Sequence, residues 1–182
     1  MKKLFACTFA LWLTAGTAAA GWLEDWGRQT WEEAKYVWRS DHYDMYVPLY
    51  AWHNRLAYDD EHIAKYNENA FGFGLGKSVY DEAGNWYGVY AFAFKDSNYE
   101  LETVAGFAYQ KNWNLDPDGN WKAGIGYTIG MTQREEYAYI PIPMPLPIAG
   151  IEYKRLALQT AYVPGLKNFG NVMLFWLRFN LD

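Results

Sequence analysis

Along most of the chain, large apolar residues alternate with small or polar ones in segments of about ten residues, and turn-forming residues separate these segments. A period of two predicts β-strands, because successive side chains of a strand point to opposite faces. We expect eight strands, at residues 44–58, 70–80, 86–95, 101–113, 121–132, 147–154, 156–163 and 171–181. Residues 22–39 instead place apolar side chains in helical stripes, which predicts an amphipathic helix.

The connections between the predicted strands alternate in length. Short turns are expected at 81–85, 114–120 and 154–155, whereas the loops at 59–69, 133–146 and 164–170 are longer. Outer-membrane barrels have short periplasmic turns and longer external loops. No segment of residues 21–182 is long and apolar enough for a spanning helix, so only a closed barrel would cross a membrane. The predicted fold is therefore an all-β, eight-stranded antiparallel transmembrane β-barrel, preceded by a helix that either lies on the membrane surface or closes one barrel end.

Composition and the first residues agree with export to a membrane. Aromatic residues make up 20% of the chain, and aromatic belts at the membrane interfaces would account for them. The net charge of −5 and the scattered basic residues argue against a nucleic-acid partner. Residues 1–20 combine basic residues, an apolar run and a terminal Ala-Ala-Ala, which predicts a secretory signal peptide and leaves 21–182 as one domain. The only cysteine, Cys7, lies in that signal, so we expect no disulfide.

The two faces of the predicted strands differ in side-chain size. We expect the larger residues to face lipid: Phe71, Phe73, Leu75, Tyr90, Phe92, Phe94, Ile125, Tyr127, Ile129 and Met131. The opposite face would line the lumen: Gly72, Gly74, Gly76, Val89, Ala91, Ala93, Gly106, Ala108, Gly124, Gly126 and Gly130. Side chains normally fill a barrel of this size, so this set predicts an empty apolar tube that holds an apolar guest such as an acyl chain. The alternative is that the glycines relieve strain in a strongly curved sheet.

One group of polar residues has the composition of a catalytic site. His53 lies near the end of the first predicted strand, and Asp96 and Ser97 directly follow the third. Because the first and third strands of such a barrel run in the same direction, these residues lie at the same, external end. A histidine can take a proton from an attacking hydroxyl, a carboxylate can orient the histidine, and a serine can act as nucleophile or hydrogen-bond donor. Taken singly, an Asp-Ser pair usually forms a turn and a rim histidine is usually solvated.

Two other patterns carry no chemistry that we expect to be used. His42 and His62 have acidic neighbours but no metal-ligand spacing, and they fall at opposite ends of the first strand. Residues 72–76 alternate glycine with large apolar residues and no helix follows them, which excludes a phosphate-binding loop. We therefore expect neither a metal nor a cofactor.

Prolines interrupt hydrogen bonding at the external ends of two neighbouring strands. Pro147 and Pro164 lie near those ends of the sixth and seventh strands, and proline cannot donate to a strand ladder. The two gaps would open the barrel wall in the plane of the membrane and admit a lipid sideways. The alternative is that the prolines of residues 141–147 only stiffen a loop.

The chain resembles the PagP family of outer-membrane lipid A palmitoyltransferases in six segments, at residues 41–48, 51–55, 65–68, 93–97, 139–143 and 170–172. The resemblance implies an eight-stranded barrel behind a periplasmic helix. It also implies transfer of an acyl chain from the sn-1 position of a phospholipid to a hydroxyacyl chain of lipid A, the acceptor part of lipopolysaccharide. We expect a monomer in the outer membrane.

The resemblance also assigns individual residues. The family's catalytic residues fall on His53, Asp96 and Ser97, and the prolines of its lateral lipid gate on Pro147 and Pro164. A second wall opening matches Pro48, although Ala70 stands where the family has proline.

The floor of the acyl pocket aligns with Ala108, where the family pattern has glycine, and Gly72, Gly74 and Gly106 would line the same pocket. A methyl group at the floor predicts a donor chain shorter than palmitate. Two other functions remain open from the sequence: a non-catalytic structural or adhesion barrel, and a passive conduit for apolar molecules.

Overall fold

The computed structural model describes residues 21–182, so the predicted signal peptide lies outside the described residues. Residues 21–38 are helical, close to the predicted 22–39. The helix up to Tyr36 and the segment from Val37 to Asp182 are separate compact units. Among the described residues, no helix is both long and apolar enough to cross a membrane.

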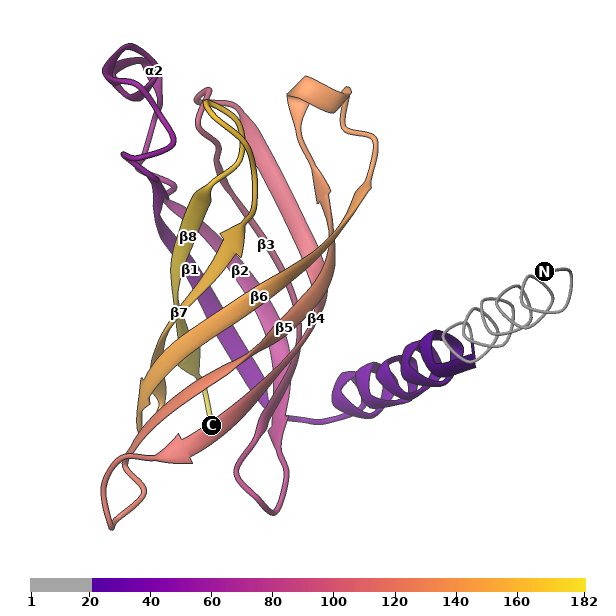
Figure 1. The fold of residues 1–182 in the computed structure, drawn as a ribbon. Coiled ribbons are helices and arrows are strands. Elements are labelled where there is room, and N and C mark those ends of the chain that lie inside the picture. Colours follow the sequence, from indigo (N-terminus) through magenta and orange to yellow (C-terminus); the bar gives the residue numbers. More distant parts are fainter. Residues whose placement is uncertain (1–20) are drawn as a thin grey trace, which may run out of the picture. The chain divides into compact units, whose positions relative to one another are not determined.

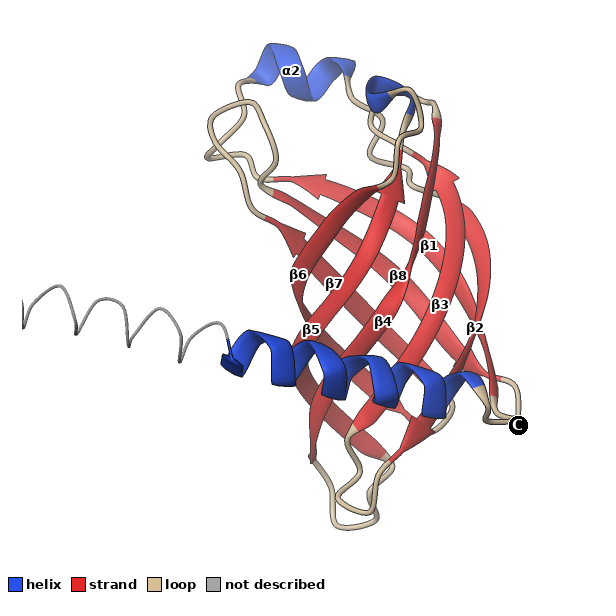
Figure 2. Cartoon of the chain, turned by 90° about the vertical axis from the view of Figure 1, so that its right-hand side faces the viewer, coloured by secondary structure: helices blue, strands red, loops and turns tan. Residues whose placement is uncertain are grey.

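Eight antiparallel strands form a closed barrel in which each strand pairs with the next along the chain and the last pairs with the first (Figure 1). The strands are β1 (Tyr43–His53), β2 (Gly72–Tyr80), β3 (Trp86–Lys95), β4 (Leu101–Asn114), β5 (Trp121–Gln133), β6 (Ile142–Tyr153), β7 (Leu156–Val163) and β8 (Val172–Asn180). Figure 2 shows their tilt around the barrel. The predicted fold is confirmed.

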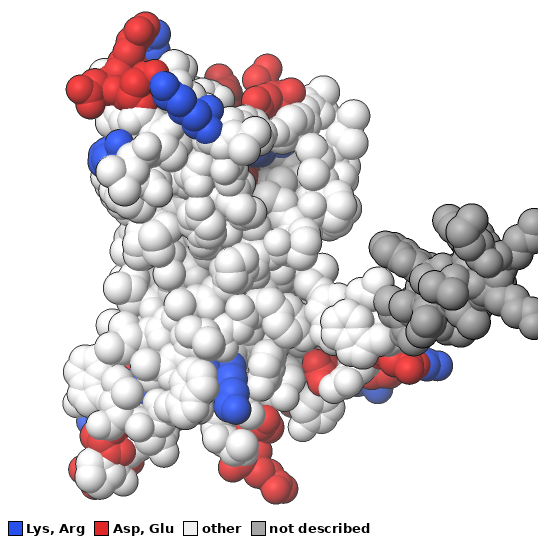
Figure 3. Space-filling view, viewed as in Figure 1, with Lys and Arg blue, Asp and Glu red and all other residues white. Residues whose placement is uncertain are grey.

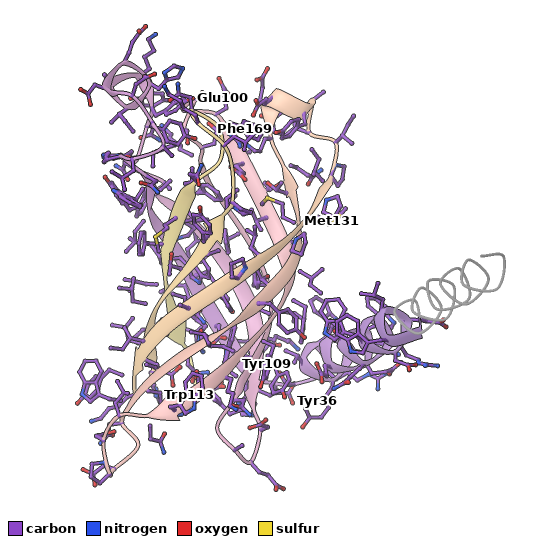
Figure 4. All side chains as sticks on the ribbon, in the orientation of Figure 1. Tyr36, Glu100, Tyr109, Trp113, Met131 and Phe169 are labelled. Carbon is purple, nitrogen blue, oxygen red and sulfur yellow. The ribbon has the colours of Figure 1, made fainter. Side chains whose placement is uncertain are left out.

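The connections give the barrel two different ends. Helix α2 (Asp60–Lys65) and the longer loops lie at one end, which we call the α2 end, and the short turns lie at the other, the turn end (Figure 1). In Figure 4, Glu100 and Phe169 lie at the α2 end, whereas Tyr109 and Trp113 lie toward the turn end. On the face shown in Figure 3, charged side chains of the barrel gather at the two ends and an uncharged band separates them, as expected of a barrel that spans a bilayer.

Two strand boundaries differ from the prediction by more than two residues. Strand β1 ends at His53 rather than residue 58, because Asn54 starts a turn: its side chain accepts a hydrogen bond from the Leu56 amide (2.9 Å), and its carbonyl accepts one from Tyr58 N (3.0 Å). Strand β6 begins at Ile142 rather than residue 147, and it contains Pro143, Pro145 and Pro147 at alternate positions. Alternate residues of an antiparallel strand bond to the same neighbour, so these prolines remove donors toward one neighbour only.

The regular strand ladders stop short of the α2 end at two places in the barrel wall, which we call seams. The β6–β7 ladder stops at Ile148 and Ala161, although β6 continues to Ile142. The β1–β2 ladder stops at Tyr46 and Gly74, although β1 continues to His53. The seam at β1–β2 is therefore present even though Ala70 replaces the proline expected there.

The predicted faces of β3 are reversed in the structure. Its buried aromatic side chains point inward, and Val89, Ala91 and Ala93 lie on the outer face, which they share with Tyr87. The buried aromatic residues of β3 are Trp86, Tyr90, Phe92 and Phe94. The outward predictions on β2 and β5 are correct for Phe73, Leu75, Ile125 and Met131, which are exposed.

The inward rings of β3 explain the glycines of the adjacent strands. In register, Gly72 lies opposite Phe94, Gly74 opposite Phe92, and Gly106 opposite Tyr90. A Cβ atom added at Gly74 would lie 2.2 Å from the Cβ of Phe92 and 2.3 Å from the carbonyl oxygen of Ala91, far inside van der Waals contact. The glycines therefore accommodate aromatic side chains and do not line an empty tube.

Polar side chains fill the interior at the turn end. Gln159 donates to Gln110 (3.1 Å) and accepts from the indole of Trp176 (3.1 Å). Nearer the turns, the buried Arg178 pairs with Asp44 at 3.5 Å and with Glu152. The expectation of an empty apolar tube is thus wrong for this half, which polar and charged side chains occupy.

Candidate functional site

His53 and Ser97 meet inside the α2 end. His53 is the last residue of β1 and Ser97 lies two residues beyond β3; both strands are antiparallel to β2 and therefore end at the same side of the barrel. The Nε2 atom of His53 lies 2.9 Å from the Ser97 hydroxyl, and the His53 side chain is almost completely buried. The topology that placed these residues at one end also brings them into contact.

The carboxylate that contacts the imidazole is Glu68. Its Oε1 atom lies 3.2 Å from Nδ1 of His53 and accepts the His53 backbone N–H at 3.0 Å. An ionised carboxylate only accepts hydrogen bonds, so Nδ1 carries the proton in this contact. The lone pair then lies on Nε2, where it accepts the hydroxyl proton of Ser97. We expected Asp96 in this orienting role; in this structure its carboxylate is hydrogen-bonded to Asn98, Glu100 and Arg134 instead.

Asp96 instead shapes the loop that carries Ser97. One of its carboxylate oxygens accepts the backbone N–H groups of Asn98 (2.8 Å) and Glu100 (3.0 Å), and the other accepts from Arg134 (3.1 Å). The amide of Asn67 donates to the Asp96 carbonyl at 3.0 Å. Within residues 21–182, the Asp96 carboxylate is hydrogen-bonded only to this loop and to Arg134.

Glu68 is held as a carboxylate by a cation. Arg55 forms a two-point ion pair with it, in which Nη2 donates to Oε2 at 2.6 Å, and the Tyr50 hydroxyl donates to the same oxygen. The Arg55 guanidinium is the main reason that the pKa of Glu68 lies well below its usual range. The ring of His53 is also fixed by Tyr66, stacked at 4.8 Å, and by the edge of Tyr58 at 5.1 Å between centroids.

A cavity of about 300 Å³ extends from this site into the α2 half of the barrel. His53, Ser97 and Pro164 line its α2 end, and its walls are mainly apolar, including Phe92, Phe94, Val104, Met144, Leu146 and Leu174. Along their strands, Tyr90, Thr128 and Trp176 are the lining residues nearest the turn end, so they form the floor. The hydroxyl groups of Tyr90 and Thr128 are hydrogen-bonded to each other at 2.6 Å, so these two polar groups of the floor are paired.

The predicted pocket residues lie beside this cavity and not in its lining. Ala108 is buried and lies in register between Gly88 and Thr128, next to the floor. Gly72, Gly74 and Gly106 lie in register with Phe94, Phe92 and Tyr90. Pro147 is the first residue of β6 beyond the β6–β7 ladder, where the gate was predicted.

Sequence reasoning missed Glu68. It belongs to a long polar loop, and its segment was noted only as part of the family resemblance. The strand pattern carries no signal for it, because it does not determine the path of the loop. In the structure the loop returns toward the end of β1, where the Ala51 amide donates to the Glu68 carbonyl at 2.9 Å. This loop therefore runs beside β1 along the β1–β2 seam.

The arrangement can move a proton from a hydroxyl to Nε2 of His53 next to an apolar cavity with room for part of a hydrocarbon chain. Within residues 21–182, no group of three or more His, Cys, Asp or Glu side chains is placed to hold a metal ion. Such a site suits the transfer or hydrolysis of an acyl group.

Comparison with known proteins gives a consistent answer. The family model described as "Antimicrobial peptide resistance and lipid A acylation protein PagP" matches residues 33–178. The chain is 43% identical over 188 residues to the lipid A acyltransferase PagP of Klebsiella pneumoniae subsp. pneumoniae, which covers 97% of this chain and 96% of that protein. It is 46% identical over 154 residues to that of Laribacter hongkongensis (85% and 74% covered), and 49% over 143 residues to that of Yersinia enterocolitica (79% and 70% covered).

Proposed function

The chain belongs to the PagP family, and we propose that it is an outer-membrane lipid A acyltransferase whose proton transfer is carried out by His53. The observation that carries this proposal is the hydrogen bond between His53 Nε2 and the Ser97 hydroxyl at the mouth of an apolar cavity. An acyl chain in the cavity would place its ester carbonyl at the mouth, next to the base and the hydroxyl.

In the proposed reaction, the acyl chain moves from the sn-1 position of a phospholipid to the hydroxyl of a hydroxyacyl chain on lipid A. The oxygen of the attacking hydroxyl bonds to the ester carbonyl carbon while His53 Nε2 takes the proton of that hydroxyl. The bond from that carbon to the glycerol oxygen then breaks, and the proton on Nε2 passes to this oxygen. The products are acylated lipid A and a lysophospholipid, and no water is consumed.

Ser97 takes part in one of two ways that share this base. It either attacks the donor ester first and forms an acyl-enzyme, or it hydrogen-bonds the reacting oxygen while the lipid A hydroxyl attacks directly. Both require an unprotonated Nε2 in contact with the Ser97 hydroxyl, as the geometry supports. Asp96 serves either route by holding the loop on which Ser97 lies.

Access for lipids is supported by the two seams, at which the strand ladders stop. The β6–β7 seam, with Pro147 and Pro164 beside it, and the β1–β2 seam both lie at the α2 end, which we assign to the external leaflet. Donor and acceptor lipids would reach His53 through the wall without leaving the membrane. We assign the acceptor to the external leaflet because lipid A resides there, and we propose that the protein acts as a monomer.

The test is acyl transfer by the purified protein in detergent with one defined phospholipid and lipid A. We expect lipid A that is heavier by one acyl chain, together with an equal amount of lysophospholipid. The variants His53→Ala and Ser97→Ala should lose this activity while keeping the barrel, as measured by circular dichroism. Folded variants with full activity would contradict the assignment and favour a non-catalytic barrel or a passive conduit.

A further inference from the structure

Glu68 makes contacts that the proposed reaction has not used so far. It approaches the imidazole from the side opposite Ser97, so that a hydroxyl, an imidazole and a carboxylate lie in one hydrogen-bonded row. The contact to the ring is supported by a second one, from the His53 backbone N–H to the same carboxylate oxygen at 3.0 Å. Two bonds from one residue to one oxygen fix both the position and the direction of the carboxylate.

The surroundings of Glu68 keep it charged and immobile. Arg55 pairs with both of its oxygens, the Tyr50 hydroxyl donates to one of them, and its carbonyl accepts the Ala51 amide. The side chain of Glu68 is 14% exposed, whereas that of Arg55 is 45% exposed, so the carboxylate faces the site and the guanidinium covers its outer side. A carboxylate fixed in this way is suited to act on a neighbouring ring.

From this geometry we propose that Glu68 is the positioning residue for His53: it holds the proton on Nδ1 and stabilises the imidazolium that forms when Nε2 takes a proton. This inference rests on the proposed acyl transfer and extends it. It separates the two acidic residues of the site, because Asp96 positions Ser97 through its loop and Glu68 positions His53. No atom of Glu68 needs to touch a substrate.

The proposal predicts a change in the pH dependence of the reaction. His53 must be neutral to act as a base, so the rate falls as pH decreases through the pKa of His53. An adjacent carboxylate favours the protonated ring, and its removal should therefore shift this acidic limb to lower pH while the maximal rate falls. The other titratable groups against the ring are Tyr58 and Tyr66, while Arg55 lies behind Glu68. On the Ser97 side, Asp96 and Arg134 are paired with each other.

The experiment compares full-length wild type, Glu68→Gln, Asp96→Asn and Glu61→Gln in the acyl-transfer assay across the pH range in which histidine titrates. Glu61 is exposed on α2 and pairs only with Lys65 among the described ion pairs, so Glu61→Gln controls for loss of a loop carboxylate. We expect Glu68→Gln to lower the maximal rate roughly 100-fold or more and to shift the acidic limb to lower pH. Asp96→Asn should lower the rate without that shift, and Glu61→Gln should match wild type.

Nuclear magnetic resonance of ¹⁵N-histidine-labelled wild type provides a second test that needs no variant to fold. We expect the neutral His53 ring to carry its proton on Nδ1. A proton on Nε2, a Glu68→Gln variant with the wild-type rate, or a slow variant with an unmoved limb would each overturn the proposal. If wild type itself transfers no acyl chain to lipid A, the proposed function fails. If wild type and Glu61→Gln are active, but Glu68→Gln keeps the wild-type rate or is slow with an unmoved acidic limb, only the role of Glu68 is refuted.

Discussion

The methyl group of Ala108 should limit the length of the acyl chain that the cavity accepts. Ala108 lies on β4 in register with Thr128, one of the three floor residues, and its side chain is only 2% exposed. The substitution Ala108→Gly removes one methyl group beside the floor residue Thr128. Because the interior is closely packed, the loss should allow the floor to shift and the cavity to deepen by about one methylene.

The size of the effect follows from the cost of one misfitting methylene. Burial of one methylene is worth about 0.8 kcal/mol, and pockets discriminate one methylene by about 1–3 kcal/mol. The ratio of rates for two donors that differ by one methylene should therefore change by about 4-fold to 150-fold in favour of the longer chain.

The assay offers the purified protein an equimolar mixture of phospholipids with different sn-1 chains and determines the acylated lipid A by mass spectrometry. Ala105→Gly is the matched control: it makes the same change on the same strand, but Ala105 is on the outer face of β4. A folded Ala108→Gly variant with the wild-type chain-length distribution would refute the reasoning, as would an equal shift in Ala105→Gly.

Three further predictions follow from the packing, the seams and the loop. Gly74→Ala should lower the free energy of unfolding by about 1–3 kcal/mol, measured in urea on detergent-solubilised protein, because the added methyl overlaps Phe92. Cysteines introduced by Leu146→Cys and Val163→Cys, joined across the β6–β7 seam by a reducible bifunctional thiol reagent, should block acyl transfer until the link is reduced. Asp96→Asn should slow transfer and increase the mobility of residues 96–100, measured by amide hydrogen exchange, since Asp96 accepts two backbone N–H groups of that loop.

Each of these has a contrary result. An unchanged unfolding midpoint in Gly74→Ala would mean that β2 and β3 do not approach as closely at Gly74 and Phe92 as the structure shows. For the seam, Ile151→Cys with Leu158→Cys is the control, because this pair lies in the hydrogen-bonded part of β6 and β7. Equal inhibition by both links, or none by the first, would exclude the seam as the lipid path. An Asp96→Asn loop with wild-type exchange would remove the loop-holding role.

The alternation of apolar and small residues was sufficient to predict the barrel, its strand number and the end at which His53 and Ser97 meet. It was not sufficient to decide which face of β3 points inward. A period of two separates the faces of a strand but does not orient them, and either face of β3 is apolar enough for lipid. The decisive information lies on the neighbouring strand, since a Cβ at Gly72 or Gly74 would overlap the Cβ of Phe94 or Phe92 on the same face.

The catalytic partners show a similar division. His53 and Ser97 were found because each lies at a strand end, and strand direction alone brings such positions together. Glu68 lies in a loop whose path the strand pattern does not determine. Asp96 was the nearest acid in the sequence to Ser97, but its carboxylate is engaged by the amides of its own loop. Proximity in the sequence thus pointed to Asp96, which shapes the loop, and not to Glu68, which contacts the His53 ring.

The central claim is that this barrel transfers an acyl chain to lipid A through His53. The most direct test is mass spectrometry of lipid A from cells that lack the native gene and express either wild type or His53→Ala at equal levels in the outer membrane. We predict lipid A with one additional acyl chain only in cells that express wild type. The same additional chain in cells with His53→Ala, or its absence in both, would contradict the account.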